Sequence, residues 1–212
     1  MRFPDATSWV FDLDNTLYPA SADLFGQMDP LMTQFIATTL AVSETRADSI
    51  RRDTWARYGA TLTGLIAEYN IDPAAFLEAT HQLDLTVLTP DPSLAQAIAA
   101  LPGQRFIHTN GPRAHAARVL EARRLDGLFT QIVAIEDTGY VSKPDPRATA
   151  FFLDQTGFDP ARAVMVEDQA ANLIEPARHG MATIWITESE EPAPDHVTHK
   201  TRDLAGFLEG LS

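Results

Sequence analysis

Cysteine is absent from this sequence. Its absence excludes disulfide bonds, metal sites built from thiolates and a cysteine nucleophile. A chain without cysteine fits a reducing compartment, and residues 1–14 contain no apolar run long enough for a signal peptide. No segment approaches the apolar length that a membrane span requires. We therefore expect a cytoplasmic protein that has no membrane partner.

Positive charge is also scarce. The chain has 16 lysine and arginine residues against 29 aspartate and glutamate residues, which gives a formal net charge of -13. This balance argues against a general attraction to nucleic acid polymers or anionic membranes. The same field repels an anionic small molecule. Any phosphate site in this protein must therefore carry its own local cations.

Apolar residues, in contrast, make up 45% of the 212 residues. That share is too high for a disordered chain and is enough for a sizeable buried core. The length fits one medium domain, or a core domain that carries a smaller inserted one. The oligomeric state is left open by the sequence.

Short apolar runs recur along the chain at residues 9–13, 105–108, 131–135, 163–166 and 183–187. Continuous runs of this kind are typical of parallel strands that are buried on both faces of a sheet. From about residue 89 onward they alternate with helix-spaced apolar residues, as in 94–101 and 170–177. A short last strand and a helix over 203–211 end the pattern. The alternation predicts an α/β fold with a doubly wound parallel sheet.

The stretch from about residue 20 to 88 has a different spacing of apolar residues. Its apolar residues have helical spacing, as at Leu24, Met28 and Leu31, and it holds no convincing strand. Asp72 followed by Pro73 is a normal helix start. We therefore predict a core domain over 1–18 and 89–212, interrupted by an all-helical insertion over 19–88.

The strongest local signal is the carboxylate pair Asp12 and Asp14, directly after the first apolar run. The carboxyl end of a strand is where open α/β sheets bind ligands. One carboxylate there can attack phosphorus while the other handles a proton, and both can bind a hard divalent cation. The alternative is an Asx turn or a helix cap.

Three further polar groups follow later strands. Thr109 comes after the second run, Lys143 after the third, and Glu167 with Asp168 after the fourth. A hydroxyl and a lysine suit a phosphate, and two acids suit magnesium. Taken singly, each group could instead be a turn, a solvated lysine or a helix N-cap. Together they form an ordered set that is hard to obtain by chance.

This constellation resembles the haloacid dehalogenase superfamily of phosphohydrolases, across essentially the whole chain. The resemblance implies a Rossmann-like core with a helical C1 cap, a Mg²⁺ cofactor and a small phosphorylated metabolite as substrate. It implies that Asp12 is the nucleophile and Asp14 the general acid/base, while Thr109 and Lys143 orient and neutralise the phosphoryl group. Asp168 would complete a magnesium site with Asp12 and the backbone carbonyl of Asp14.

The resemblance leaves some positions less defined. Asn110 is expected to shape the phosphate pocket. Tyr18, where the chain leaves the core, either contacts substrate or acts as a hinge. Glu167 is a second candidate metal acid, and Asn172 stands where many members of the superfamily have an acid.

A narrower resemblance is to the pyrimidine 5'-nucleotidases, which dephosphorylate nucleoside monophosphates such as UMP and CMP. It rests on the segments FDLDNTLYP, YGATLTGL, HQLDL and HTNG. The alternatives are a phosphatase or mutase for a small sugar phosphate and, from a different class, a non-catalytic binding module with the same fold. A dehalogenase would use the same nucleophile but would need neither Asp14 nor the acidic pair at 167–168.

The histidines and tryptophans outside these motifs carry no partner pattern. We expect surface or capping positions for four histidines, packing for a fifth, and core positions for the tryptophans. These residues are His115, His179, His196 and His199; His108; and Trp9, Trp55 and Trp185.

Overall fold

A computed structural model describes residues 3–211 of the protein. Its centre is a six-stranded sheet in the order β3-β2-β1-β4-β5-β6, and every neighbouring pair is parallel. The strands are β1 Ser8–Phe11, β2 Gln104–His108, β3 Gln131–Val133, β4 Ala163–Glu167, β5 Ala182–Ile186 and β6 His199–Thr201. The predicted parallel α/β sheet is therefore confirmed, and each predicted run overlaps a strand.

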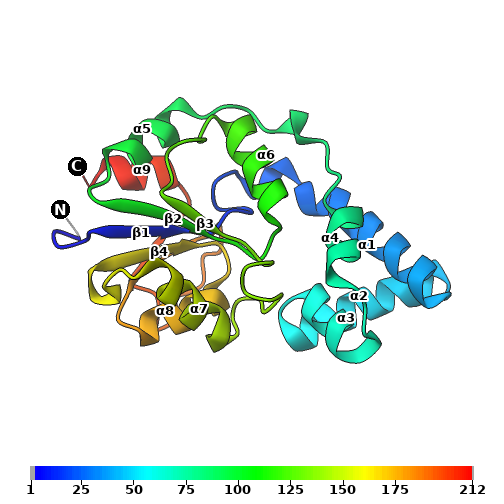
Figure 1. The fold of residues 1–212 in the computed structure, drawn as a ribbon. Helices are drawn as coiled ribbons and strands as arrows, with labels where there is room; N and C mark the ends of the chain where they lie inside the picture. The colour runs from blue at the N-terminus through cyan, green and yellow to red at the C-terminus, as the bar shows by residue number, and fades with distance from the viewer. Residues whose placement is uncertain (1–2, 212) are drawn as a thin grey trace.

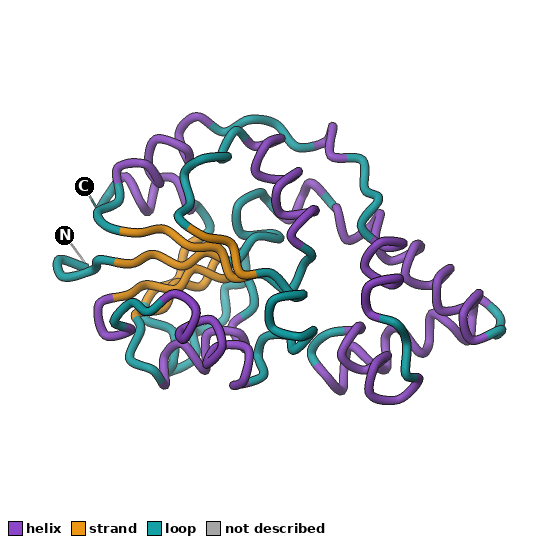
Figure 2. Tube along the Cα trace, in the orientation of Figure 1, coloured by secondary structure: helices purple, strands orange, loops and turns teal. Residues whose placement is uncertain are grey.

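Helices cover both faces of this sheet (Figures 1 and 2). On one face lie α5 Pro92–Ala100, α6 Arg113–Arg123 and α9 Leu204–Glu209, and on the other lie α7 Pro146–Thr156 and α8 Ile174–Arg178. Single turns of 3-10 helix occur at η3 Pro160–Arg162 and η4 Ala170–Leu173. The sheet is therefore doubly wound.

The side chains of β1 show why its sequence is apolar from Trp9 to Phe11. Trp9 and Phe11 pack into the cluster shared with α5, α6 and α9, whereas Val10 points into the cluster on the opposite face. All three side chains are buried. A strand buried on both faces cannot alternate apolar and polar residues.

The insertion is helical and projects beyond the carboxyl ends of the strands (Figure 1). It contains η1 Ala20–Ala22, α1 Leu24–Leu40, α2 Glu44–Tyr58, α3 Thr61–Tyr69, α4 Pro73–Thr80 and η2 Leu85–Val87. Three of its four α-helices begin at capping side chains, which are Asp23 before α1, Ser43 before α2 and Asp72 before α4. They enclose a second apolar core around Ile36, Leu65 and Phe76. The helical insertion is confirmed, while its proposed bounds of 19–88 stay a prediction.

Two details differ from the sequence-based expectation. The helix predicted over 170–177 is divided into η4 and α8, and its second half carries Pro176, which has no N–H to continue the ladder. Trp55 is not a core residue, because 56% of its surface is exposed. Among the helices of residues 3–211, none is long and apolar enough to cross a membrane.

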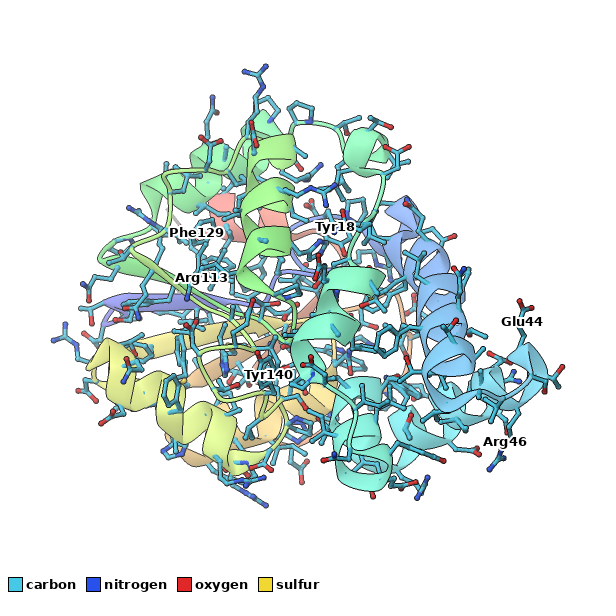
Figure 3. All side chains as sticks on the ribbon, turned by 45° about the vertical axis from the view of Figure 1, so that its right-hand side comes forward. Tyr18, Glu44, Arg46, Arg113, Phe129 and Tyr140 are labelled. Atoms are coloured by element: carbon cyan, nitrogen blue, oxygen red, sulfur yellow. The ribbon has the colours of Figure 1, made fainter. Side chains whose placement is uncertain are left out.

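Contacts between insertion and core hold the two parts together. The hydroxyl groups of Thr63 on α3 and Ser142 of the core lie 2.7 Å apart. A Cβ on Gly59 would lie only 3.2 Å from the ring of Pro144, so the backbone at Gly59 approaches that ring closely. Tyr140, which Figure 3 labels in the segment between β3 and α7, packs against the apolar core of the insertion.

Arg123 on α6 binds both of the segments that connect the core to the insertion. Its buried guanidinium donates to the carbonyl oxygens of Leu17, before the insertion, and Thr89, after it. It also donates to the carboxylate of Asp91 at 2.8 Å. One side chain therefore satisfies acceptors on both linkers.

We expect Arg123→Met to lower the free energy of unfolding by about 2–4 kcal/mol, because it leaves these acceptors without their charged donor. A urea titration followed by circular dichroism measures the change. The neighbouring exposed Arg124 gives a matched control, and Arg124→Met should leave the midpoint unchanged. Equal midpoints for the two variants would contradict the role given to Arg123.

Candidate active site

The polar residues singled out in the sequence converge at the carboxyl end of the sheet. β1 lies between β2 and β4, so the chain winds outward in one direction up to β3 and in the other from β4 onward. Such a switch point is where doubly wound sheets form their binding crevice. Asp12 follows β1 and bonds through its backbone N–H to the carbonyl of Val166 on β4, so its carboxylate and Glu167 are neighbours.

A local turn presents Asp12 and Asp14. Between them Leu13 is buried completely, and its carbonyl accepts from the N–H groups of Thr16 and Leu17. Asn15 has a φ of 57°, a conformation that asparagine tolerates better than most residues. The turn therefore anchors the intervening apolar residue and turns both carboxylates to the end of the sheet.

Lys143 is the centre of the buried charge cluster. Its Nζ donates to Asp12 Oδ1 at 2.7 Å, to Glu167 Oε2 at 2.6 Å and to the carbonyl of His108 at 2.7 Å. Only 1% of Lys143 is exposed. Because an ammonium group has three N–H donors, this set uses all of them. In this arrangement Lys143 holds Asp12 rather than pointing into the open cavity.

The charges of this cluster shift its pKa values. Burial and the charge of Glu167 raise the pKa of Asp12 to about 7, although Lys143 opposes the shift. Burial, Asp12 and Glu167 raise the pKa of Asp168 to about 9. Burial acts to lower the pKa of Lys143, but Asp12 and Glu167 outweigh it and raise that pKa. The cluster therefore has more acids than its one lysine balances.

This excess fits a divalent cation. Carboxylate oxygens of Asp12, Glu167 and Asp168 lie within 4.8 Å of one another. Three carboxylates and one ammonium carry a formal charge of -2, and oxygen ligands are those that Mg²⁺ prefers. Two oxygens of Glu167 are already engaged, by Lys143 and by the N–H of Gln169. Asp12 and Asp168 are therefore the better placed ligands.

Asp14 lies outside that cluster and has its own partners. Its Oδ1 accepts from the hydroxyl of Tyr18 at 2.7 Å and is 2.8 Å from Nε2 of His115 on α6. Burial acts to raise the pKa of Asp14, but the charge and hydrogen bond of His115 and the bond from Tyr18 outweigh it, and the pKa is lowered. The two carboxylates of the turn therefore have opposite shifts.

Thr109 and Asn110 follow β2 and shape the floor. The hydroxyl oxygen of Thr109 accepts from the N–H of Gly111 at 2.9 Å, which leaves its own proton free to be donated. The side chain of Asn110 brackets the backbone of Lys143, with bonds of 2.8 and 3.0 Å to its N–H and its carbonyl. Asn110 therefore fixes the segment that carries the lysine.

A cavity joins this floor to the insertion. Its polar floor comes from the core and its roof from the four helices of the insertion. The floor is lined by Asp12, Asp14, Asn110, Gly111, Glu167, Asp168, Gln169 and Asn172, and the roof by Phe25, Met28, Met32, Trp55, Gly59, Ala60, Thr61, Leu62, Phe76, Leu77 and His81. Thr109, Lys143 and Tyr18 lie behind this lining and act on it through the bonds given above.

Two residues of the site have no sequence signal of their own. His115 was expected at a surface or cap, but it is buried and bonded to Asp14, from which it is 101 positions away. Trp55, expected in the core, borders the cavity. His108 does pack, since its ring stacks on Phe152 at 4.5 Å. The positions of His115 and Trp55 are therefore known only from the fold.

The sequence is similar to a known protein family and to individual proteins of known name. The model of the haloacid dehalogenase-like hydrolases matches residues 9–180. The chain is 25% identical to Phosphate metabolism protein 8 of Saccharomyces cerevisiae, with 98% of this chain and 71% of that protein covered. It is 26% identical to Phosphoglycolate phosphatase 1 of Pseudomonas aeruginosa, with 92% and 77% covered.

Solved structures share the fold. A HAD phosphatase from Thermococcus onnurineus superposes with a TM-score of 0.66 at 18% identity, covering 97% of this chain and 98% of that one. The magnesium-bound HAD hydrolase YfnB from Bacillus subtilis gives a TM-score of 0.61 at 18% identity, covering 98% and 99%. The core and the helical insertion are thus an arrangement that known structures also have.

The raised pKa values give a pH-dependent response to magnesium. Because the folded-state pKa values of Asp12 and Asp168 lie above the ordinary value of 3.8, raising the pH from about 4 towards 9 forces charge into the buried cluster and lowers stability. A bound cation offsets that charge. We expect saturating Mg²⁺ to raise the Tm by roughly 5–10 °C at pH 8 and by less at pH 6.

Thermal unfolding with and without MgCl₂ at the two pH values measures this effect. Asp168→Asn should remove most of the rise, whereas Asp154→Asn, at an exposed position, should keep it. A rise of the same size at both pH values, or one that persists in Asp168→Asn, would count against the assignment of this cluster to magnesium.

Proposed function

The chain belongs to the haloacid dehalogenase-like hydrolases, and we propose that it is a magnesium-dependent phosphomonoesterase that forms an aspartyl-phosphate on Asp12. The observation that carries the proposal is the carboxylate of Asp12, held by Lys143 in a cluster of acids that borders the cavity between core and insertion. Asp14 borders the same cavity from the same turn. The names of the curated relatives, which include phosphatases, support this reaction class.

In the first step an oxygen of Asp12 attacks phosphorus, and the bond between phosphorus and the ester oxygen breaks. Lys143 keeps Asp12 oriented and helps to keep it ionised. Asp14 gives a proton to the departing alkoxide. Its lowered pKa makes it a carboxylate in the resting site, so it must gain this proton as substrate binds, when the negative phosphate raises its pKa.

In the second step a water molecule attacks the phosphorus of the aspartyl-phosphate. Asp14, now a carboxylate, accepts the proton of that water, and the bond between phosphorus and Asp12 breaks to release inorganic phosphate. Tyr18 and His115 hold the Asp14 carboxylate in place through both steps. Asp12 and Asp168, with the backbone carbonyl of Asp14, would hold Mg²⁺, which offsets charge on the phosphoryl oxygens when bound.

Nucleoside 5'-monophosphates of the UMP and CMP type are the proposed substrates. The segments that resemble pyrimidine 5'-nucleotidases supply cavity residues: 58–65 contributes four, from Gly59 to Leu62, and 81–85 contributes His81. These are residues of the roof, where a leaving group would lie. We keep a phosphatase for a smaller ester as a second candidate, because two curated relatives are named phosphoglycolate phosphatases.

Phosphate release with and without Mg²⁺ from UMP, CMP, sugar phosphates and 2-phosphoglycolate tests the proposal. We expect metal-dependent turnover that favours UMP or CMP. Asp12→Asn should form no alkali-labile phosphoenzyme, and Asp14→Asn should lower kcat by ~10²–10⁴-fold because it removes the proton donor. Asp154→Asn serves as the control at an exposed aspartate.

Other outcomes separate the alternatives. Turnover of Asp12→Asn at the rate of the unchanged protein would contradict the assignment of the nucleophile. Metal-dependent turnover of another ester would keep the mechanism and replace the substrate. A phosphoryl group that is retained on an isomerised product would indicate a mutase, and binding without turnover would indicate a binding module.

The bond between His115 and Asp14 leads to a pH prediction. His115→Gln can keep a donor but loses the charge, so the pKa of Asp14 should rise. Asp14 must be protonated in the first step and gains that proton as substrate binds, so the limb of kcat that falls towards alkaline pH should move to higher pH. Tyr18→Phe should move it in the same direction. His179→Gln, at an exposed histidine, should leave the profile unchanged, and an unshifted profile in His115→Gln would contradict the proposed pairing.

A further inference from the structure

The roof of the cavity exposes aromatic side chains. Only three large apolar residues are exposed among residues 3–211, and two of them, Phe25 at 38% and Trp55 at 56%, line this cavity. The third, Val87 on η2, lies outside it. Exposed apolar surface that gathers at one cavity is a sign of a binding function.

The same roof is apolar along its length. Phe25, Met28 and Met32 are three and four positions apart on α1, so one face of that helix points to the cavity. Trp55 joins them from α2 and Phe76 from α4. The wall opposite the carboxylates therefore carries five large aromatic and thioether side chains.

No lysine or arginine of the described residues 3–211 lines this cavity. The one titratable roof residue that can carry a positive charge is His81, and its Nδ1 donates to the carbonyl of Leu77. Burial and the neighbouring His115 lower the pKa of His81 to about 4, so its ring is neutral near pH 7. The roof thus offers no cation to a second anionic group of a substrate.

We infer that the leaving group of the substrate is an uncharged molecule with a flat ring, which packs against Phe25 and Trp55, and that esters with a second acid are rejected. The inference rests on the proposed phosphomonoesterase function and names the substrate class for it. A ring gains contact by covering Phe25 and Trp55. A carboxylate on the leaving group would instead meet an apolar wall, with the acids of the floor on its other side.

Three phosphate esters test this inference under saturating Mg²⁺. UMP has the ring, ribose 5-phosphate has the same sugar without the ring, and 2-phosphoglycolate has a second acid. We expect kcat/KM to be at least roughly tenfold higher for UMP than for 2-phosphoglycolate. Trp55→Ala should lower kcat/KM for UMP by roughly 5- to 150-fold, the range for loss of stacking on one base.

The loss in Trp55→Ala should be specific to the ring. Ribose 5-phosphate should lose less activity than UMP in this variant, since it has no ring to stack. Val87→Ala, which shortens the exposed apolar residue outside the cavity, should change neither ester. Met32→Arg places a cation in the roof while its stem keeps apolar packing, and it should raise the rate with 2-phosphoglycolate relative to UMP.

Two kinds of failure are distinguishable. Metal-dependent turnover that depends on Asp12 but prefers 2-phosphoglycolate, or an equal loss for UMP and ribose 5-phosphate in Trp55→Ala, overturns this inference and leaves the phosphomonoesterase intact. Absence of phosphate release from all three esters and from 4-nitrophenyl phosphate overturns both.

Discussion

The structure depends on one buried ionic arrangement, in which Lys143 holds Asp12 and Glu167. Burying three charges is costly unless each is paired and hydrogen-bonded, and here the three N–H donors of the lysine have three acceptors. The pairing requires that β1, β2 and β4 end side by side and that the segment before α7 returns to them. Ser142, one residue before the lysine, contacts Thr63 of the insertion. The floor of the cavity and the helical insertion are thus joined through adjacent residues.

The fold was predictable wherever burial dictated the sequence. β1 and β4 are buried on both faces, so their sequences are apolar except for Ser8 and Glu167 at the ends, and they stand out. β3 is only three residues long and partly exposed, and the run 131–135 extended past it because Ala134 and Ile135 are buried outside the sheet. In the cap, α2 is a polar helix with few buried residues, so apolar spacing gave it no signal and its caps define it.

The residues of the candidate site were predictable where a polar side chain directly follows a strand. Asp12, Thr109 and Asp168 each come after a strand, so the parallel topology alone brings them to one edge. The pairing of His115 with Asp14 depends on where α6 packs, and no spacing in the sequence encodes that distance of 101 positions. The orientation of the Lys143 side chain could also not be predicted from the sequence, because its position is compatible with bonding either a phosphate or the acids behind it.

Because the net charge is -13, a phosphate site in this protein needs local cations. The structure limits the groups that can supply this positive charge. Lys143 is engaged by two acids, and the described lining of the cavity has neither lysine nor arginine. Positive charge at the floor must therefore come largely from a divalent cation, helped by backbone N–H groups and the Thr109 hydroxyl. One cation beside the acids can offset the negative charge of one phosphate group. The charge count of the floor and the apolar roof consequently support the same proposal: a substrate with a single anionic end.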